Sequence, residues 1–336
     1  MGMHFRKLLT SLAFAALHLT PQSINAIGFN PVVFHATFGS NEAIIVGTLH
    51  ASRVPPTALF ALAKRLLQSA DAFAVESLNN ESAERELDVL FSYAANESAN
   101  LFSMLDRQNR TCVERLLTES LGMKSDAVEK LKKQHLSRIA AISWGALSSD
   151  LGVALFPGFD RVLLEYALTH RIKVAELEGA VAAHKFDRAL SPAAILADVD
   201  RVCFVSSNSA LLMEYDQEQR ELLVLFETGK SDAARSRLFD LNLNRMKFSR
   251  GDLAFADNRN EFIAHNLMLQ MKNNRRSVIA IGPMHLTGPN AVQILLEKQG
   301  VRIRRSSLHT VNFLSRREHI VEPASDPKRA RGLGQP

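Results

Sequence analysis

The sequence predicts an α/β protein, in which a central mixed sheet is flanked by helices and a helix-rich insertion lies between two similar motifs. Short apolar runs typical of buried strands, at 44–46, 72–75 and 277–281, alternate with helical patterns. Two of these runs continue in the same way, through Gly47-Thr48-Leu49-His50 and Gly282-Pro283-Met284-His285, before a breaker and a helical pattern. Each motif therefore places an imidazole just beyond the carboxyl end of a core strand, where ligands bind in open α/β sheets.

The first part of the chain reads as a hairpin followed by a β-α-β unit. Val32–Phe38 and Ala43–Val46 are expected strands, divided by a turn at 39–41. A helix with a leucine face follows Pro55-Pro56, and the next strand, 72–75, ends at Glu76. Strands joined in this way are parallel, and their carboxyl ends share one edge of the sheet. His50 and Glu76 are thus expected at the same edge.

Helical patterns dominate the middle of the chain, at about 81–155 and 180–270, and we expect them to form the insertion. Between them, Asp160 stands in the first turn of a predicted helix, and a strand at 173–175 ends near Glu176 and Glu178. After the strand at 277–281, the sequence predicts a helix at 289–298, closed by Gly300, and a last strand at 301–305.

Composition is that of a folded domain of ordinary size. The chain has 336 residues, of which 46% are hydrophobic and 22% charged, and no linker is evident, so we expect one domain over 27–314. The net charge of +5 lies mainly at the two ends of the sequence, and the chain has one Trp and three Tyr. Massed basic residues and stacking aromatics are therefore absent, and no nucleic-acid partner is expected.

The ends of the chain read as processing or solvent-exposed segments. Residues 1–26 have a short cationic start, an apolar run at 8–17 and a small residue before the expected cleavage point, which is typical of a signal peptide. Export to the periplasm or the medium follows, with membrane association only through an uncleaved signal. The basic tail at 315–336, rich in Pro and Gly, is expected to be disordered.

Cys112 and Cys203 are the two cysteines of the chain. An oxidising compartment would permit a disulfide between them, and two buried thiols are the alternative. They do not have the spacing of a metal motif.

The two histidines and the carboxylate form a set that suits a divalent metal. His50, Glu76 and His285 would give two imidazoles and one carboxylate, which suit Zn²⁺, Mn²⁺ or Co²⁺ and leave positions open for water and substrate. Water bound to such a metal is acidified and can attack a carbonyl group. The alternative is a pair of histidines at strand ends with purely structural partners.

Taken in order, the motifs resemble those of the TraB/GumN family, whose relatives include the Tiki metalloproteases. The resemblance covers roughly residues 30–305. Its matching segments are Ile45–Ser52, Ala74–Glu76, Gly158–Leu164, Val174–Glu178, Asn258–Asn260 and Ile281–Pro289. It implies an α/β fold with a helical insertion. It also implies a metal-dependent centre formed by His50, Glu76 and His285.

Further residues of the motifs have expected roles around this centre. Arg259 could hold a substrate carboxylate or a developing oxyanion, or it could instead form an ion pair with Glu178 or Asp160. Asn260 could orient water or backbone. Glu178 could act as a general base, and Asp160 as a helix cap or as a residue supporting the centre.

The resulting expectation is an exported metal-dependent hydrolase, a peptidase acting on a peptide or protein substrate. The alternative, from a different functional class, is a non-catalytic protein of the cell envelope that binds a peptide or pheromone. In either case Gly47 and Gly282 shape the loops that carry the histidines, by allowing a sharp turn or a close approach.

Overall fold

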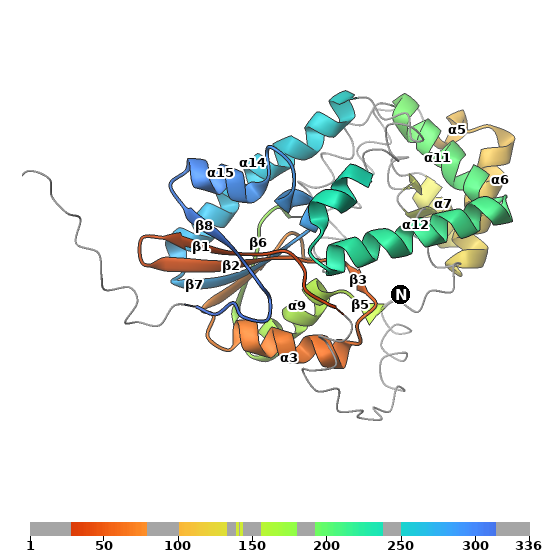
Figure 1. Ribbon diagram of the computed structural model, residues 1–336. Coiled ribbons are helices and arrows are strands. Elements are labelled where there is room, and N and C mark those ends of the chain that lie inside the picture. The colour runs from red at the N-terminus through yellow and green to blue at the C-terminus, as the bar shows by residue number, and fades with distance from the viewer. Residues whose placement is uncertain are drawn as a thin grey trace, which may run out of the picture.

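A computed structural model describes residues 28–78, 101–132, 139–140, 142–143, 156–179, 192–237 and 250–313. A six-stranded sheet with helices on both faces forms one end of the molecule, and a group of helices forms the other (Figure 1). The predicted α/β class and central mixed sheet are confirmed. The expected signal peptide, the segment at 81–100 and the basic tail at 315–336 lie outside the described residues.

The sheet has the order β6-β4-β7-β2-β1-β8. Its strands are β1 (Val33–Phe38), β2 (Asn41–Gly47), β4 (Ala72–Val75), β6 (Lys173–Glu176), β7 (Arg276–Ile281) and β8 (Arg302–Ser306). Strands β6, β4, β7 and β2 are parallel, whereas β1 runs antiparallel to both of its neighbours. A second sheet joins β3 (Ala51–Ser52) to β5 (Phe156–Pro157).

Two apolar layers cover the faces of the large sheet. Helices α3 (Pro56–Leu67) and α9 (Phe159–Thr169) pack on one face, where Leu59, Leu66 and Phe159 are almost fully buried. Helices α14 (Arg250–Asn273) and α15 (Val292–Lys298) cover the other face. The helix predicted at 289–298 is shorter than expected, because a 3₁₀ turn, η2 (Pro283–Leu286), and an irregular stretch precede it.

The remaining helices form a group of their own. They are α5 (Leu101–Met104), α6 (Arg107–Arg115), the π-helix η1 (Leu116–Ser120), α7 (Ser125–Lys132), α11 (Pro192–Ser206) and α12 (Ser209–Glu227). Buried side chains from α6, η1, α7 and α11 share one apolar cluster. The helix-rich character expected for these parts of the chain is confirmed within the described residues. None of the described helices is long and apolar enough to cross a membrane.

A disulfide joins Cys112 on α6 to Cys203 on α11, across 91 residues of sequence, and so resolves the alternatives left by the sequence. A loop of this length is costly to close in the unfolded chain. The crosslink therefore stabilises the helical group by restricting the unfolded ensemble, by roughly 4 kcal/mol in the chain-entropy model.

Replacing both cysteines by serine should lower the free energy of unfolding by roughly 4 kcal/mol, since the loop is then free to open. Chemical denaturation, with the wild type under reducing conditions as a matched sample, measures the change. Thiol titration of the unreduced, unfolded wild type should give no free thiol. Two free thiols per chain would contradict the assignment.

Candidate functional site

Four parallel strands end side by side, and the residues that follow them define the candidate site. We call this edge of the sheet the carboxyl rim: the residues just beyond the ends of β2, β7, β4 and β6. The register aligns Gly47 with Ile281 and Val75 with both Ala280 and Glu176. Glu76, Glu178 and Gly282 therefore come together from three neighbouring strands, as the sequence predicted for strand ends in a parallel sheet.

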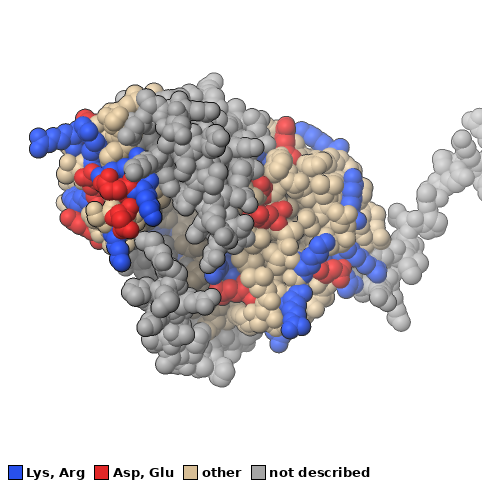
Figure 2. Space-filling view, turned by 180° about the vertical axis from the view of Figure 1, so that it is seen from behind, with Lys and Arg blue, Asp and Glu red and all other residues tan. Residues whose placement is uncertain are grey.

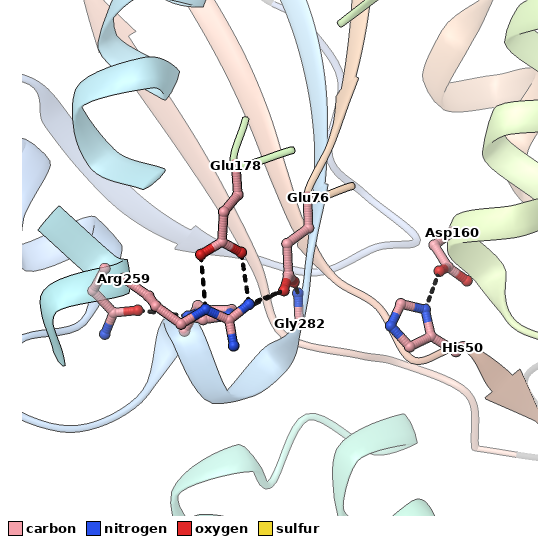
Figure 3. A network of polar contacts seen from close by, with 8 residues as sticks. His50, Glu76, Asp160, Glu178, Arg259 and Gly282 are labelled. Atoms are coloured by element: carbon pink, nitrogen blue, oxygen red, sulfur yellow. Dashed lines mark hydrogen bonds and ion pairs between the residues drawn. The ribbon is translucent and has the colours of Figure 1, made fainter. Parts of the chain in front are cut away.

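An arginine from helix α14 lies between two carboxylates of the carboxyl rim (Figure 3). Arg259 donates from Nε to Glu178 Oε1 at 2.8 Å and from Nη2 to Glu178 Oε2 at 2.6 Å. The same Nη2 donates to Glu76 Oε1 at 2.7 Å. The fork geometry of guanidinium suits this paired contact, and the Glu178 side chain is fully buried. Arg259 thus holds together the ends of β4 and β6, and of the two expected ion-pair partners it contacts Glu178.

Glu76 is the point where the network meets the second histidine loop. Its Oε2 accepts from the backbone N–H of Gly282 at 3.0 Å, and Oε1 lies 3.4 Å from His285 Nε2. Burial by itself raises the pKa of Glu76. The hydrogen bond and charge of His285, the charge of Arg259 and the Gly282 N–H outweigh burial and lower this pKa to about 2. Glu76 is therefore an anion at neutral pH.

Asn260, next to Arg259 on α14, fixes the orientation of His285. Its Nδ2 donates to the carbonyl oxygen of Asn290 at 2.9 Å, which sets the direction of the amide. Its Oδ1 then lies 2.6 Å from His285 Nδ1 and can only accept, so Nδ1 carries a proton. His285 Nε2 is left facing Glu76. In this arrangement Asn260 supports the imidazole, a more specific role than the orientation of water or backbone expected from the sequence.

His50 has a partner of its own, separate from the Arg259 network. Its Nδ1 lies 2.6 Å from Asp160 Oδ2, on helix α9. Gly158 is the N-cap of that helix, and no side chain caps it, so Asp160 does not have the capping role that was one of its two expected roles. The hydrogen bond to Asp160 and the charges of Asp160 and Glu76 raise the pKa of His50. The imidazole is 86% exposed, so its Nε2 is open to a ligand.

The seven polar site residues thus form two groups. Glu76, Glu178, Arg259, Asn260 and His285 are linked in one network, and Figure 3 shows His50 and Asp160 to one side of it. Among the described residues, no three His, Cys, Asp or Glu side chains are grouped closely enough to hold a metal ion. The expected pairing of Glu76 with His285 is present, while His50 makes no direct contact with either.

Neighbouring atoms leave little room for a side chain at the two motif glycines, Gly47 and Gly282. A Cβ on Gly47 would lie 2.5 Å from Val32 Cγ1, and one on Gly282 would lie 3.2 Å from Glu76 Oε2. Gly282 has φ −55°, and Gly47 is absent from the described residues with positive φ. Close approach, and not a left-handed turn, therefore accounts for glycine at both positions.

The segment from Glu227 to Arg235, which no sequence motif marks as functional, contacts both histidine loops. Glu227, at the end of α12, is buried and accepts from Ser52 Oγ at 2.8 Å and from the backbone N–H and Nε of Arg53, at 2.9 and 2.7 Å. Arg235 donates to the carbonyl oxygen of Thr287 at 3.1 Å. Leu49 and Met284, each directly before a motif histidine, pack on the same small apolar cluster around Phe226. No local sequence pattern indicates such long-range contacts.

The donor set fits a divalent metal in its chemistry. In both motif histidines, Nδ1 is bonded to an oxygen acceptor and Nε2 is the nitrogen presented, an orientation typical of metal-ligating histidine. Glu76 adds a carboxylate that is ionised at neutral pH. His285 Nε2 faces that carboxylate at 3.4 Å, a contact that is favourable when a proton or a cation stands between them.

Comparison with known proteins gives one finding. The model of the TraB/PrgY/gumN family matches residues 32–305, a span that contains every residue of the candidate site. No curated protein and no solved structure matched the chain.

Replacing Glu76 by Gln should remove a pH-dependent part of the stability. The pKa of Glu76 is about 2 in the folded protein against an ordinary value of 4.5. Its ionised form therefore stabilises the fold by roughly 3 kcal/mol above pH 4.5, and this stabilisation is lost as the pH falls toward 2. Urea unfolding at pH 7, 4.5 and 3 measures it, with the exposed Glu165→Gln as control. Equal pH slopes for E76Q and the wild type would contradict the assignment.

Replacing Asn260 by Ala should allow the imidazole of His285 to adopt either of its two neutral tautomers. In the wild type, Nδ1 is protonated because its partner can only accept; in N260A that acceptor is lost, and the ring is free to adopt the other tautomer. Nitrogen-detected NMR of the imidazole resolves the two forms, with the exposed Asn312→Ala as control. A wild-type His285 without a proton on Nδ1 would exclude this role for Asn260.

Proposed function

Because the chain belongs to the TraB/PrgY/gumN family, we propose that it is an exported, metal-dependent hydrolase that cleaves a peptide or protein. Export rests on the signal-like pattern of residues 1–26. The metal rests on the donor set at the carboxyl rim. The substrate class rests on the resemblance to the Tiki metalloproteases.

The observation that carries the proposal is that the two motif histidines make the same kind of hydrogen bond through Nδ1. They lie far apart in the sequence, and each has Nδ1 bonded to a side-chain oxygen at 2.6 Å. A structural histidine has no need for this orientation in both loops, whereas a metal ligand does, because Nε2 must keep its lone pair. Its recurrence favours a shared ligand over two unrelated packing roles.

The metal would be held by His285 and Glu76, with His50 as the third ligand after the two histidine loops approach one another, since the three side chains are not grouped closely enough in the structure as described. A bound Zn²⁺, Mn²⁺ or Co²⁺ ion would supply an acidified water and polarise the carbonyl group of the substrate. The protein's own residues prepare this site. Asn260 and Asp160 orient the imidazoles, and Arg259 holds Glu76 in place through an ion pair.

Arg259 and Glu178 are assigned support in preference to direct chemistry. Both oxygens of Glu178 accept from Arg259, and its side chain is fully buried, so it is poorly placed to take a proton from water. Arg259, which is partly exposed, is held next to the carboxyl rim with its positive charge, where it would favour a substrate that carries negative charge or develops it.

Metal binding is tested with the purified protein after exchange into buffer containing Zn²⁺, Mn²⁺ or Co²⁺. We expect about one ion per chain in the wild type, with at least tenfold weaker binding in His285→Ala and His50→Ala. His265→Ala, which removes an exposed histidine from α14, is the matched control and should bind as the wild type does. Equal metal content in all four proteins would refute the centre.

Hydrolysis is tested separately, by incubating the metal-loaded protein with a peptide library and identifying new termini by mass spectrometry. New termini that disappear in H285A but persist in H265A would support a peptidase. Retention of peptides without any product would instead assign the chain to the alternative class, a peptide-binding protein.

A further inference from the structure

The opposite edge of the sheet carries a concentration of positive charge. We call this edge the amino rim: the beginnings of β6, β4, β7 and β8, with the turns that lead into them. Helices α3, α9, α14 and α15 each run directly into one of these strands, so all four helices end here. Six exposed basic residues lie at these ends, namely Arg171, Lys173, Lys272, Arg275, Lys298 and Arg302.

The register places these residues along a continuous row. Lys173 aligns with Ala72 at one edge of the sheet, Arg276 with Glu42 in the middle, and Thr37 with Arg302 at the other edge. Six strands at the usual spacing span about 24 Å. A row of this length is a surface, and it is too wide for a single small anion.

The positive charge of the amino rim exceeds the partial negative charge of the four helix C-termini that end there. Basic residues near helix C-termini offset partial negative charges of roughly 0.5 each, which amount to about 2 for four helices. The exposed acids of the amino rim are Asp71 and Glu297, so six basic residues leave four positive charges, about twice that need. Glu42 is buried and bonded to His35. Within the described residues, none of the six basic side chains lies at ion-pair distance from a carboxylate.

The carboxyl rim has the opposite sign. On the carboxyl rim and the two histidine loops with their contacts, the carboxylates of Glu76, Glu176, Glu178, Asp160 and Glu227 exceed in number the guanidinium groups of Arg53, Arg235 and Arg259. The sheet domain is thus positive at one edge and negative at the edge that holds the candidate site. Figure 2 shows basic side chains spread over the described surface at the sheet end of the molecule, at the right of the view, with acidic ones among them. Such a distribution would orient the domain near a charged surface.

The end of the described chain adds to the amino rim. Phe313 lies against Arg276, with the guanidinium carbon 5.9 Å from its ring centre. Leu168 and Leu269 are exposed within a turn of the ends of α9 and α14, the helices on the two opposite faces of the sheet. Apolar side chains among basic ones suit a lipid headgroup layer, whereas base-stacking aromatics would suit a nucleic acid.

We propose that the amino rim docks on the surface of a bilayer that contains anionic lipid, with the candidate site facing away from it. The sequence alone led us to expect membrane contact only through an uncleaved signal; the folded domain offers a second route, through headgroup charge. This docking does not depend on the proposed hydrolase activity, because it uses the other edge of the sheet.

The test is sedimentation of the full chain with vesicles of phosphatidylglycerol and phosphatidylcholine in equal parts, against pure phosphatidylcholine. We expect binding to the anionic vesicles in 0.1 M salt, with strong weakening at 0.5 M. The triple variant Lys173→Glu, Lys272→Glu, Arg302→Glu should bind at least about 100-fold more weakly, since each basic residue contributes about fivefold. The control Lys124→Glu, Lys130→Glu, Lys230→Glu reverses three exposed charges elsewhere and should bind as the wild type does.

Three results would overturn the proposal: equal binding to neutral and anionic vesicles, equal losses in the two triple variants, or no binding to either vesicle. Circular dichroism of both variants verifies that the fold is retained. Binding of the wild type and of both triple variants to double-stranded DNA is measured in parallel. Rim-dependent binding to DNA without binding to vesicles would identify a nucleic-acid surface and refute the lipid assignment.

Discussion

A single guanidinium holds the carboxyl rim together. Two glutamates end neighbouring strands of a parallel sheet, one of them fully buried, and in the absence of a cation they would repel one another across a medium of low polarity. Arg259 meets both, through three hydrogen bonds of 2.6 to 2.8 Å. Loss of one partner from a buried arrangement of this kind costs about 3–5 kcal/mol, because a charge is left uncompensated. The placement of Glu76 beside His285 depends on this contact.

The two histidine loops are controlled from outside the sheet as well. The segment from the end of α12 to Arg235 contacts the first loop through Glu227 and the second through Arg235, and it packs on the residue before each histidine. Helix α12 extends from there into the helical group that the disulfide stabilises (Figure 1). The helical insertion is thus connected to both histidine loops of the site.

Much of the fold could be predicted from the sequence because strand patterns are local. The runs at 44–46, 72–75 and 278–281 are apolar throughout, as buried parallel strands require, and their order placed Glu76 and His285 at one edge. The family resemblance identified Arg259 and Asn260. Glu178 was one of the two partners expected for Arg259. The contacts of Arg259 with Glu76 and of Asn260 with His285 could not be predicted, because a hydrogen bond between residues 183 or 25 positions apart leaves no trace in either segment.

The remaining differences have the same cause. For Asp160 the sequence left a capping role and a supporting role open; the residue bonds to His50, because β5 and α9 bring it beside the first loop. Glu227 and Arg235 belong to ordinary helical patterns and gain their importance only from tertiary contacts. The disulfide depends on the distance between α6 and α11, which the sequence does not give.

The central claim is that the two loops and Glu76 share one metal ion. Crystals of the protein grown with Mn²⁺ or Co²⁺, measured at the absorption edge of the metal, test it most directly. The account predicts an anomalous peak at about 2.1 Å from Nε2 of both His50 and His285 and in contact with a Glu76 oxygen. No peak at the carboxyl rim, or a peak bound through other residues, would contradict it.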